Sequence, residues 1–241
     1  MQITGSTLKW IAMGTMVLDH LAAVVLMPVY GVSFNGSFDL AGALAGGGMG
    51  ILCYTMRLIG RLAFPIFCFL LVEGLVHTHS RPRYLRNLLL LAIASEIPFD
   101  LCLRGLPLAA DVQNTIWTLV LGFLLCCVID RCGQVFTGTQ ALVLQAAVVP
   151  IFMALAMLLH TDYDAFGVAL ILLLYLLRSK RREQCLYGGA VCLYELSASL
   201  AFVPIYFYNG QRGRQNKCFF YIFYPTHLLL LYALRWWWLG W

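Results

Sequence analysis

The sequence predicts an all-α integral membrane protein, a polytopic helix bundle of about eight transmembrane helices in a single domain over residues 1–241. Hydrophobic residues make up 61% of the chain and charged residues only 11%, against about 25% charged residues in a typical soluble domain. The mean hydropathy is +0.82. A soluble fold has no means of burying so much apolar surface. The length of 241 residues accommodates roughly eight spans of about 20 residues each.

Three helices are expected in the first half of the chain, over 8–30, 51–76 and 84–103. Ser6 or Thr7 would cap the first of them. Asp19 and His20 interrupt the apolar run of this first helix, so we interpret it as a retained span and not as a cleaved signal peptide. Pro98 interrupts the third helix, where it removes a backbone hydrogen bond and is expected to bend the helix.

Five more helices are expected, over 114–129, 140–159, 165–177, 186–206 and 219–234. The run 165–177 is short for a full span, so we expect it to be tilted or partly re-entrant. The chain ends in RWWWLGW, which is typical of an aromatic belt at the membrane interface.

The distribution of Lys and Arg predicts a cytoplasmic N-terminus. The loops after the second, fourth and sixth helices would then lie inside, and they hold most of the basic residues: Arg81, Arg83, Arg131, Arg178, Lys180, Arg181 and Arg182. The loops after the first and fifth helices carry none. Eight spans would nevertheless leave one basic loop outside, with Arg212, Arg214 and Lys217. Either the span count is wrong by one near the sixth and seventh helices, or this loop has a role of its own.

Neither charge nor cysteine usage indicates nucleic acid or a metal. The net charge of +5 comes from basic residues scattered among loops, as in other polytopic membrane proteins. The nine cysteines lie mostly in apolar runs without a CxxC pair, which is typical of small packing residues. We expect no metal, no disulfide framework and no nucleic-acid partner.

Ionisable residues occur where lipid is expected, and each costs roughly 2.5–3.5 kcal/mol near the bilayer midplane. Asp19 lies about 11 residues into the first helix, or roughly 16 Å deep at 1.5 Å per residue. Arg57 and Arg61 are four residues apart and share one helix face. Five further groups fall inside apolar runs: Glu73, Glu96, Asp100, Glu195 and His227.

Some of these groups have a structural interpretation. Arg61 with Glu73 or Asp19 would form an ion pair that fixes helix register. Glu96 would pair with Arg86 or cap a broken helix. Glu195 alone is more typical of a structural residue than of a catalytic one.

Asp19, His20 and His227 favour a functional interpretation. Neither an acid nor an imidazole benefits a lipid-facing helix, and histidine changes charge near neutral pH. Neighbouring residues on a helix point about 100° apart. Either His20 therefore faces a cavity and Asp19 an arginine, or the reverse, and in both cases the helix supplies a buried base and a fixed charge.

Eight motifs along the chain resemble the TraX family, whose named member is the F-pilin acetylase of conjugation systems. They occur in order: VLDH (17–20), RLIGRLAFPIFCFLLVEG (57–74), HTHSRPRYLRNLL (77–89), SEIPFD (95–100), NTIWTLVLG (114–122), YDAFGV (163–168), YNGQRG (208–213) and FYIFYPTHLLLL (220–231). The resemblance implies a membrane-embedded N-acetyltransferase of the bacterial cytoplasmic membrane. Its donor would be acetyl-CoA, and its acceptor a peptide N-terminus such as that of pilin, or another small acceptor.

This activity suggests roles for the buried polar residues. An amine nucleophile needs a base, for which His20 is expected, oriented by Asp19 and with His227 second in line. An acyl-histidine intermediate is an alternative. The thioester oxyanion needs donors, and Asn114, Tyr224 or an arginine would serve.

The phosphates of CoA need basic contacts and close backbone approach. The chain has no Walker-type or GxGxxG loop, so the expectation falls on arginines and on the YNGQRG loop, whose glycines allow close approach. The residues expected to bind the donor are Arg57, Arg61, Arg83, Arg86, Tyr208, Asn209, Gly210, Arg212 and Tyr224.

Two other classes of function fit the same polar residues. A proton-coupled transporter or flippase also uses intramembrane acids, histidines and arginines, although transporters often contain internal repeats and this sequence has none. A non-catalytic membrane assembly factor would use the buried ion pairs only for helix register. The assembly factor predicts that His20→Ala leaves function intact.

Overall fold

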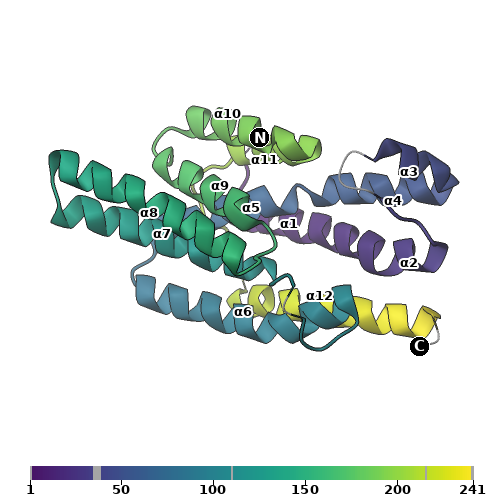
Figure 1. The fold of residues 1–241 in the computed structure, drawn as a ribbon. Coiled ribbons are helices and arrows are strands. Elements are labelled where there is room, and N and C mark those ends of the chain that lie inside the picture. The colour runs from purple at the N-terminus through teal and green to yellow at the C-terminus, as the bar shows by residue number, and fades with distance from the viewer. Residues whose placement is uncertain (1, 35–38, 110, 215, 240–241) are drawn as a thin grey trace. The chain divides into compact units, whose positions relative to one another are not determined.

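The computed structural model describes residues 2–34, 39–109, 111–214 and 216–239. These residues form α-helices joined by short loops (Figure 1), and within the described ranges the only β-type pairings are two isolated bridges. The predicted all-α class is therefore confirmed.

Five helical stretches among the described residues are long and apolar enough to cross a membrane: Gly5–Tyr30, Gly47–His77, Thr115–Val135, Gly138–Leu158 and Arg181–Tyr206. They match the first, second, fourth, fifth and seventh expected helices. The sixth is the shorter apolar helix α9 (Asp164–Leu176). The chain is thus a membrane-type helical protein, and the count of eight stays a prediction.

The chain divides into two compact units, each described here by itself. Unit 1 comprises Met1–Phe67, Ile97–Pro107 and Cys185–Trp241, and unit 2 comprises Cys68–Glu96 and Leu108–Gln184. Three helices contribute to both units, namely α5 (Ala63–His77), α6 (Arg81–Arg104) and α10 (Arg181–Val191). Helix α6 continues through Pro98 and does not end there. The single domain expected from the sequence stays a prediction.

Unit 1 begins with α1 (Gly5–His20). Thr4 caps this helix, since its Oγ1 accepts a hydrogen bond of 3.3 Å from the backbone N–H of Thr7. The cap predicted at Ser6 or Thr7 is therefore wrong, and the helix starts earlier than residue 8. The remaining elements of this unit are η1 (Leu21–Leu26), α2 (Met27–Tyr30), α3 (Leu40–Ala45), α4 (Gly47–Gly60), most of α10 (Arg181–Val191), η2 (Cys192–Ala201), α11 (Phe202–Tyr206) and α12 (Lys217–Leu239).

Two helices of unit 1 depart from α-helical geometry. Directly after His20 the chain forms one π-helical stretch, η1. In η2, which is of 3₁₀ type, the helix breaks at Glu195 and Leu196, and Leu196 has a φ of 33°. Left-handed backbone is strained for a leucine, and π-helical insertions are frequent at functional sites. Both departures lie beside ionisable residues.

The N-terminal segment of unit 1 is bound to the segment 207–214. Backbone N–H groups of Ile3, Gly5 and Ser6 donate to carbonyls of residues 207, 211 and 212 at 2.8–3.0 Å. Gly213 has a φ of 71°, and a Cβ there would meet Thr4 Oγ1 at 2.7 Å. These contacts favour the alternative in which the span count is wrong by one, because eight spans would put Arg212 and Arg214 across the membrane from the N-terminus. The count of eight stays a prediction.

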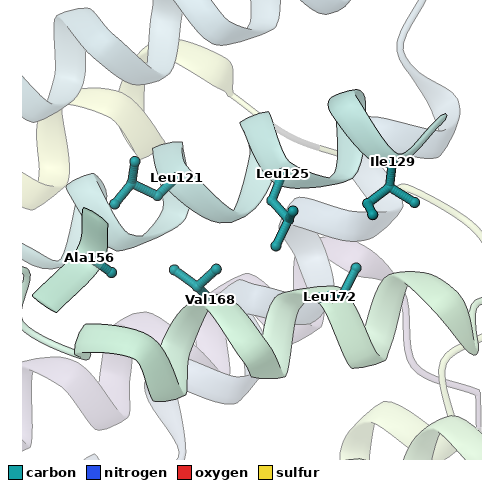
Figure 2. Close-up of a cluster of buried hydrophobic side chains, with 6 residues drawn as sticks. All are labelled: Leu121, Leu125, Ile129, Ala156, Val168 and Leu172. Atoms are coloured by element: carbon teal, nitrogen blue, oxygen red, sulfur yellow. The ribbon is translucent and has the colours of Figure 1, made fainter. Parts of the chain in front are cut away.

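Unit 2 is built on α7 (Thr115–Val135), α8 (Gly138–Leu158) and α9. Its core is aliphatic (Figure 2), and its buried members are Leu121, Leu125, Ile129, Ala156, Val168 and Leu172. Ala156 is the one buried residue of α8, whose other side chains are exposed or half-buried. A long, apolar and largely exposed helix is typical of one that faces lipid.

Candidate functional site

Two histidines from distant parts of the chain meet in unit 1. His20 ends α1 and His227 lies in α12, 207 residues later. Nδ1 of His20 lies 2.9 Å from Nε2 of His227. The two rings are nearly parallel, at 16°, with centroids 5.2 Å apart. The structure thus brings together the two histidines that the sequence singled out.

The second nitrogen of His227 is also engaged. Its Nδ1 lies 3.0 Å from the carbonyl oxygen of Phe223, one helical turn earlier. The Phe223 ring stacks on the His227 ring at 4.9 Å and 9°, and the Tyr224 ring lies 5.6 Å away. His227 is buried, with 6% exposure. These contacts fix the imidazole of His227 in both position and orientation.

Asp19, the neighbour of His20, contacts a different helix. Its Oδ2 accepts a hydrogen bond of 2.6 Å from Nη1 of Arg57 on α4. Both side chains are mostly shielded, with 15% and 28% exposure for Asp19 and Arg57. Of the two arrangements expected from the sequence, the structure has the one in which Asp19 faces an arginine. The pair carries no net charge, which lowers the cost of both groups at this depth.

A second ion pair involves Arg61, the residue that follows α4. Arg61 Nη1 lies 3.7 Å from Oε1 of Glu195, at the break in η2. Glu195 was not among the partners expected for Arg61. Glu73, one of the expected partners, pairs with Arg181 of unit 2 at 3.3 Å. Glu195, for which a structural role is predicted, therefore has Arg61 as its ion-pair partner.

The residues predicted to be functional fall in both units. Unit 1 holds Asp19, His20, Arg57, Arg61, Asp100, Glu195, Tyr208, Asn209, Gly210, Arg212, Tyr224 and His227, and unit 2 holds Glu73, Arg83, Arg86, Glu96 and Asn114. Within unit 1, the ion pairs and the histidine pair are carried by α1, α4 with the residue that follows it, η2 and α12. This polar group is our candidate site.

Asn114, expected as an oxyanion donor, is used for structure. Its Oδ1 caps α7 by accepting from Ile116 N at 3.0 Å. Its Nδ2 donates to the carbonyl of Ala92 at 2.9 Å and to Oε2 of Glu96. An amide nitrogen has two hydrogens, so both are committed. The geometry does not favour a catalytic role for Asn114.

Glu96 also has partners that the sequence did not indicate. Besides Asn114, its Oε2 accepts a hydrogen bond of 2.8 Å from the indole N–H of Trp117. The carboxylate thereby joins α6 to the first turn of α7. Glu96 thus serves as a link between helices, which agrees with its structural interpretation.

The YNGQRG segment has a local explanation for its composition. Asn209 Oδ1 accepts from Gln211 N at 2.9 Å, which forms a tight turn, and Gly210 has a φ of 76°. The same segment holds the N-terminal residues through backbone hydrogen bonds. Arg212 is exposed. The glycines therefore serve the turn and its packing.

Sequence reasoning missed one polar cluster, in unit 2. Asp130 accepts from Arg81 Nη2 at 2.5 Å and from the hydroxyl of Tyr175. The hydrogen bond to Asp130 raises the pKa of the Arg81 guanidinium above its usual range. The sequence feature that could have revealed this cluster is Asp130, an acid at the end of an apolar run, together with the basic loop that contains Arg81. This cluster ties the start of α6 to the ends of α7 and α9.

The chain is similar to known proteins over nearly its whole length. The TraX protein family matches residues 4–235. The chain is 24% identical, over 258 aligned positions, to the "Probable fimbrial assembly protein FimC, serogroup H1" of Dichelobacter nodosus, with 95% of this chain and 94% of that relative covered. No solved structure matches the chain. The family match includes both histidines and both ion pairs of the candidate site.

Proposed function

Because the chain belongs to the TraX family, we propose that it is a membrane-embedded acetyltransferase of the bacterial cytoplasmic membrane, with its N-terminus on the cytoplasmic side. It transfers the acetyl group of acetyl-CoA to an amine. The observation that carries the proposal is the contact of 2.9 Å between His20 and His227. In this contact His20 would be the base and His227 the group that holds it, next to the Asp19–Arg57 ion pair, which carries no net charge.

The reaction needs one proton acceptor and one acyl acceptor. The amine nitrogen attacks the thioester carbonyl carbon, the new N–C bond forms and the C–S bond breaks. His20 takes the proton that the amine loses, and then gives that proton to the departing CoA thiolate, which leaves as the thiol. A neutral imidazole in an apolar setting suits this role because it accepts a proton without first losing a charge partner.

The donor's phosphates need cationic groups. Arg57 and Arg61 already face carboxylates, so a contact of either with the donor would compete with its ion pair. Arg212 is exposed in unit 1, the unit that holds the histidines, and is our proposed phosphate contact. Contacts of the donor with Arg83 and Arg86 stay predictions from the sequence. Tyr224, which adjoins His227, remains the proposed oxyanion donor.

The acceptor we propose is the N-terminal amine of a pilus or fimbrial subunit, or of a similar small peptide. This proposal is supported by the resemblance to the F-pilin acetylase and by the fimbrial assembly name of the relative. A peptide amine must be deprotonated before it attacks a thioester, which is the step that a base such as His20 assists.

The test is release of free CoA by the purified protein in detergent, with acetyl-CoA and a panel of amines, peptides and alcohols. We expect amine-dependent release, which His20→Ala lowers by about a hundredfold or more, the order of a general base. His160→Asn is the matched control, because His160 is exposed and has a φ of 50°, a conformation that asparagine tolerates. Full activity in a folded His20→Ala protein would remove His20 from the mechanism.

The name of the relative also supports a second function, a non-catalytic assembly factor. In that case no acceptor stimulates CoA release, and His20→Ala leaves pilus or fimbrial assembly intact. Measurement of CoA release and of assembly in the same set of variants therefore separates the two functions. Proton-coupled flux without CoA chemistry would instead indicate a transporter.

A further inference from the structure

We propose that His227 is a positioning residue: it holds His20 in the tautomer whose Nε2 is unprotonated, so that this nitrogen is the reacting base. The inference rests on the proposed function for the identity of the reaction. The tautomer itself follows from three contacts, namely those of His20 with His227, of His227 with the Phe223 carbonyl, and of the Phe223 ring with the His227 ring.

The carbonyl oxygen of Phe223 determines which nitrogen of His227 carries a hydrogen. A carbonyl oxygen only accepts hydrogen bonds, and Nδ1 of His227 lies 3.0 Å from it. Nδ1 of His227 therefore carries a hydrogen and donates it to the Phe223 oxygen. This hydrogen bond lies within one turn of α12, so the helix itself maintains it.

The protonated nitrogen of His227 in turn determines which nitrogen of His20 carries a hydrogen. A neutral imidazole has one N–H, so with Nδ1 protonated, Nε2 of His227 is a bare acceptor. Nδ1 of His20, 2.9 Å away, must then be the donor. The chain of hydrogen bonds runs from His20 through His227 to the Phe223 carbonyl, and each acceptor in it receives one hydrogen.

The free nitrogen of the pair is therefore Nε2 of His20. Among the described residues it has no hydrogen-bond partner, so its lone pair is available to a substrate proton. When Nε2 takes that proton, Nδ1–H of His20 continues to donate to His227, and no hydrogen bond has to rearrange. A base oriented by a third group is the logic of catalytic triads, here with a neutral imidazole as the third group.

A neutral imidazole suits the buried position of His227 better than a carboxylate would. His227 is 6% exposed, with the Phe223 ring stacked on it at 4.9 Å and the His20 ring at its edge, bound through the hydrogen bond. A carboxylate at position 227 would have to be buried beside an aromatic ring, at a large desolvation cost. The stacked Phe223 ring and the hydrogen bonds at both nitrogens also prevent the ring of His227 from turning away.

The test is ¹⁵N NMR of histidine-labelled protein in detergent micelles, at a pH at which the ¹⁵N shifts report both rings as neutral. We expect His20 and His227 to be Nδ1–H tautomers. His227→Gln places an amide oxygen near the former Nε2 and should keep the His20 tautomer. His227→Leu removes the acceptor and should convert His20 to a mixture of tautomers.

The kinetic test uses the same variants. We expect His227→Leu to lower kcat by about tenfold or more with little change in the KM for acetyl-CoA, and His227→Gln to recover most of kcat. An Nε2–H tautomer of His20 in the wild-type protein would overturn the inference. So would an unchanged kcat in His227→Leu. Absence of CoA release with the expected tautomers present would instead count against the proposed function and leave the positioning role standing.

Discussion

Gly60 of α4 lies directly against Asp19 of α1: a Cβ at position 60 would stand 2.2 Å from the Cβ of Asp19 and 2.4 Å from its Oδ1. The two helices approach this closely because position 60 has no side chain. The carboxylate of Asp19 thereby comes within reach of Arg57, one turn earlier on α4.

This contact makes a single methyl group disruptive. We expect Gly60→Ala to push α1 away from α4 and to lower the free energy of unfolding by about 1–3 kcal/mol, the usual cost of overpacking. Gly14→Ala in α1 is the control, since a Cβ at position 14 meets nothing within 4 Å. It should be neutral or slightly stabilising. Thermal unfolding in detergent measures both, and equal midpoints would show that the helices do not pack as described.

The Asp19–Arg57 pair should show strong coupling. Removal of either charge alone leaves its mostly shielded partner uncompensated, so we expect Asp19→Asn and Arg57→Gln each to cost about 1–3 kcal/mol. The double variant should cost less than the sum, with a coupling energy of about 0.5–3 kcal/mol.

The matched control for this cycle is the Lys180–Glu183 pair, whose side chains are 66% and 43% exposed. An exposed pair contributes little, so the cycle of Lys180→Gln and Glu183→Gln should give almost no coupling. Additive effects at Asp19 and Arg57 would mean that their ion pair does not hold α1 to α4.

The hydrogen bonds between residues 3–6 and 207–212 predict the sidedness of both segments. Cysteines introduced at Gln2 and Gln211 should react with a membrane-impermeant maleimide from the same side of sealed vesicles, above the background of the wild-type chain. The number of membrane crossings between the two segments is then even. Labelling from opposite sides would contradict the fold of unit 1.

Much of the fold class and part of the site could be predicted from local sequence. Composition and apolar runs indicate a helical membrane protein, and helical periodicity indicates that Asp19 and His20 face different neighbours. The cost of an unpaired buried charge indicates an arginine as one possible partner of Asp19, but the sequence suggests Arg61, whereas the structure pairs Asp19 with Arg57. These are consequences of short-range geometry and of the cost of charge in lipid.

The remaining contacts depend on backbone details that no local pattern encodes. Arg61 reaches Glu195 at a break in η2, where Leu196 takes a left-handed conformation. The amide of Asn114 resembled a catalytic donor but caps α7 and binds Glu96. The capping role could have been recognised from an asparagine directly before an apolar run, whereas the contact with Glu96 is tertiary.

The separation of 207 residues between His20 and His227 has a consequence for biosynthesis. At a synthesis rate of about 5–20 residues per second, roughly 10 to 40 s pass between the appearance of the two imidazoles. Arg57 follows Asp19 by only 38 residues, so the charge of Asp19 can be neutralised while the chain is still being made. The ion pair of Asp19 thus requires only the first 57 residues of the chain, whereas the histidine pair requires the final helix.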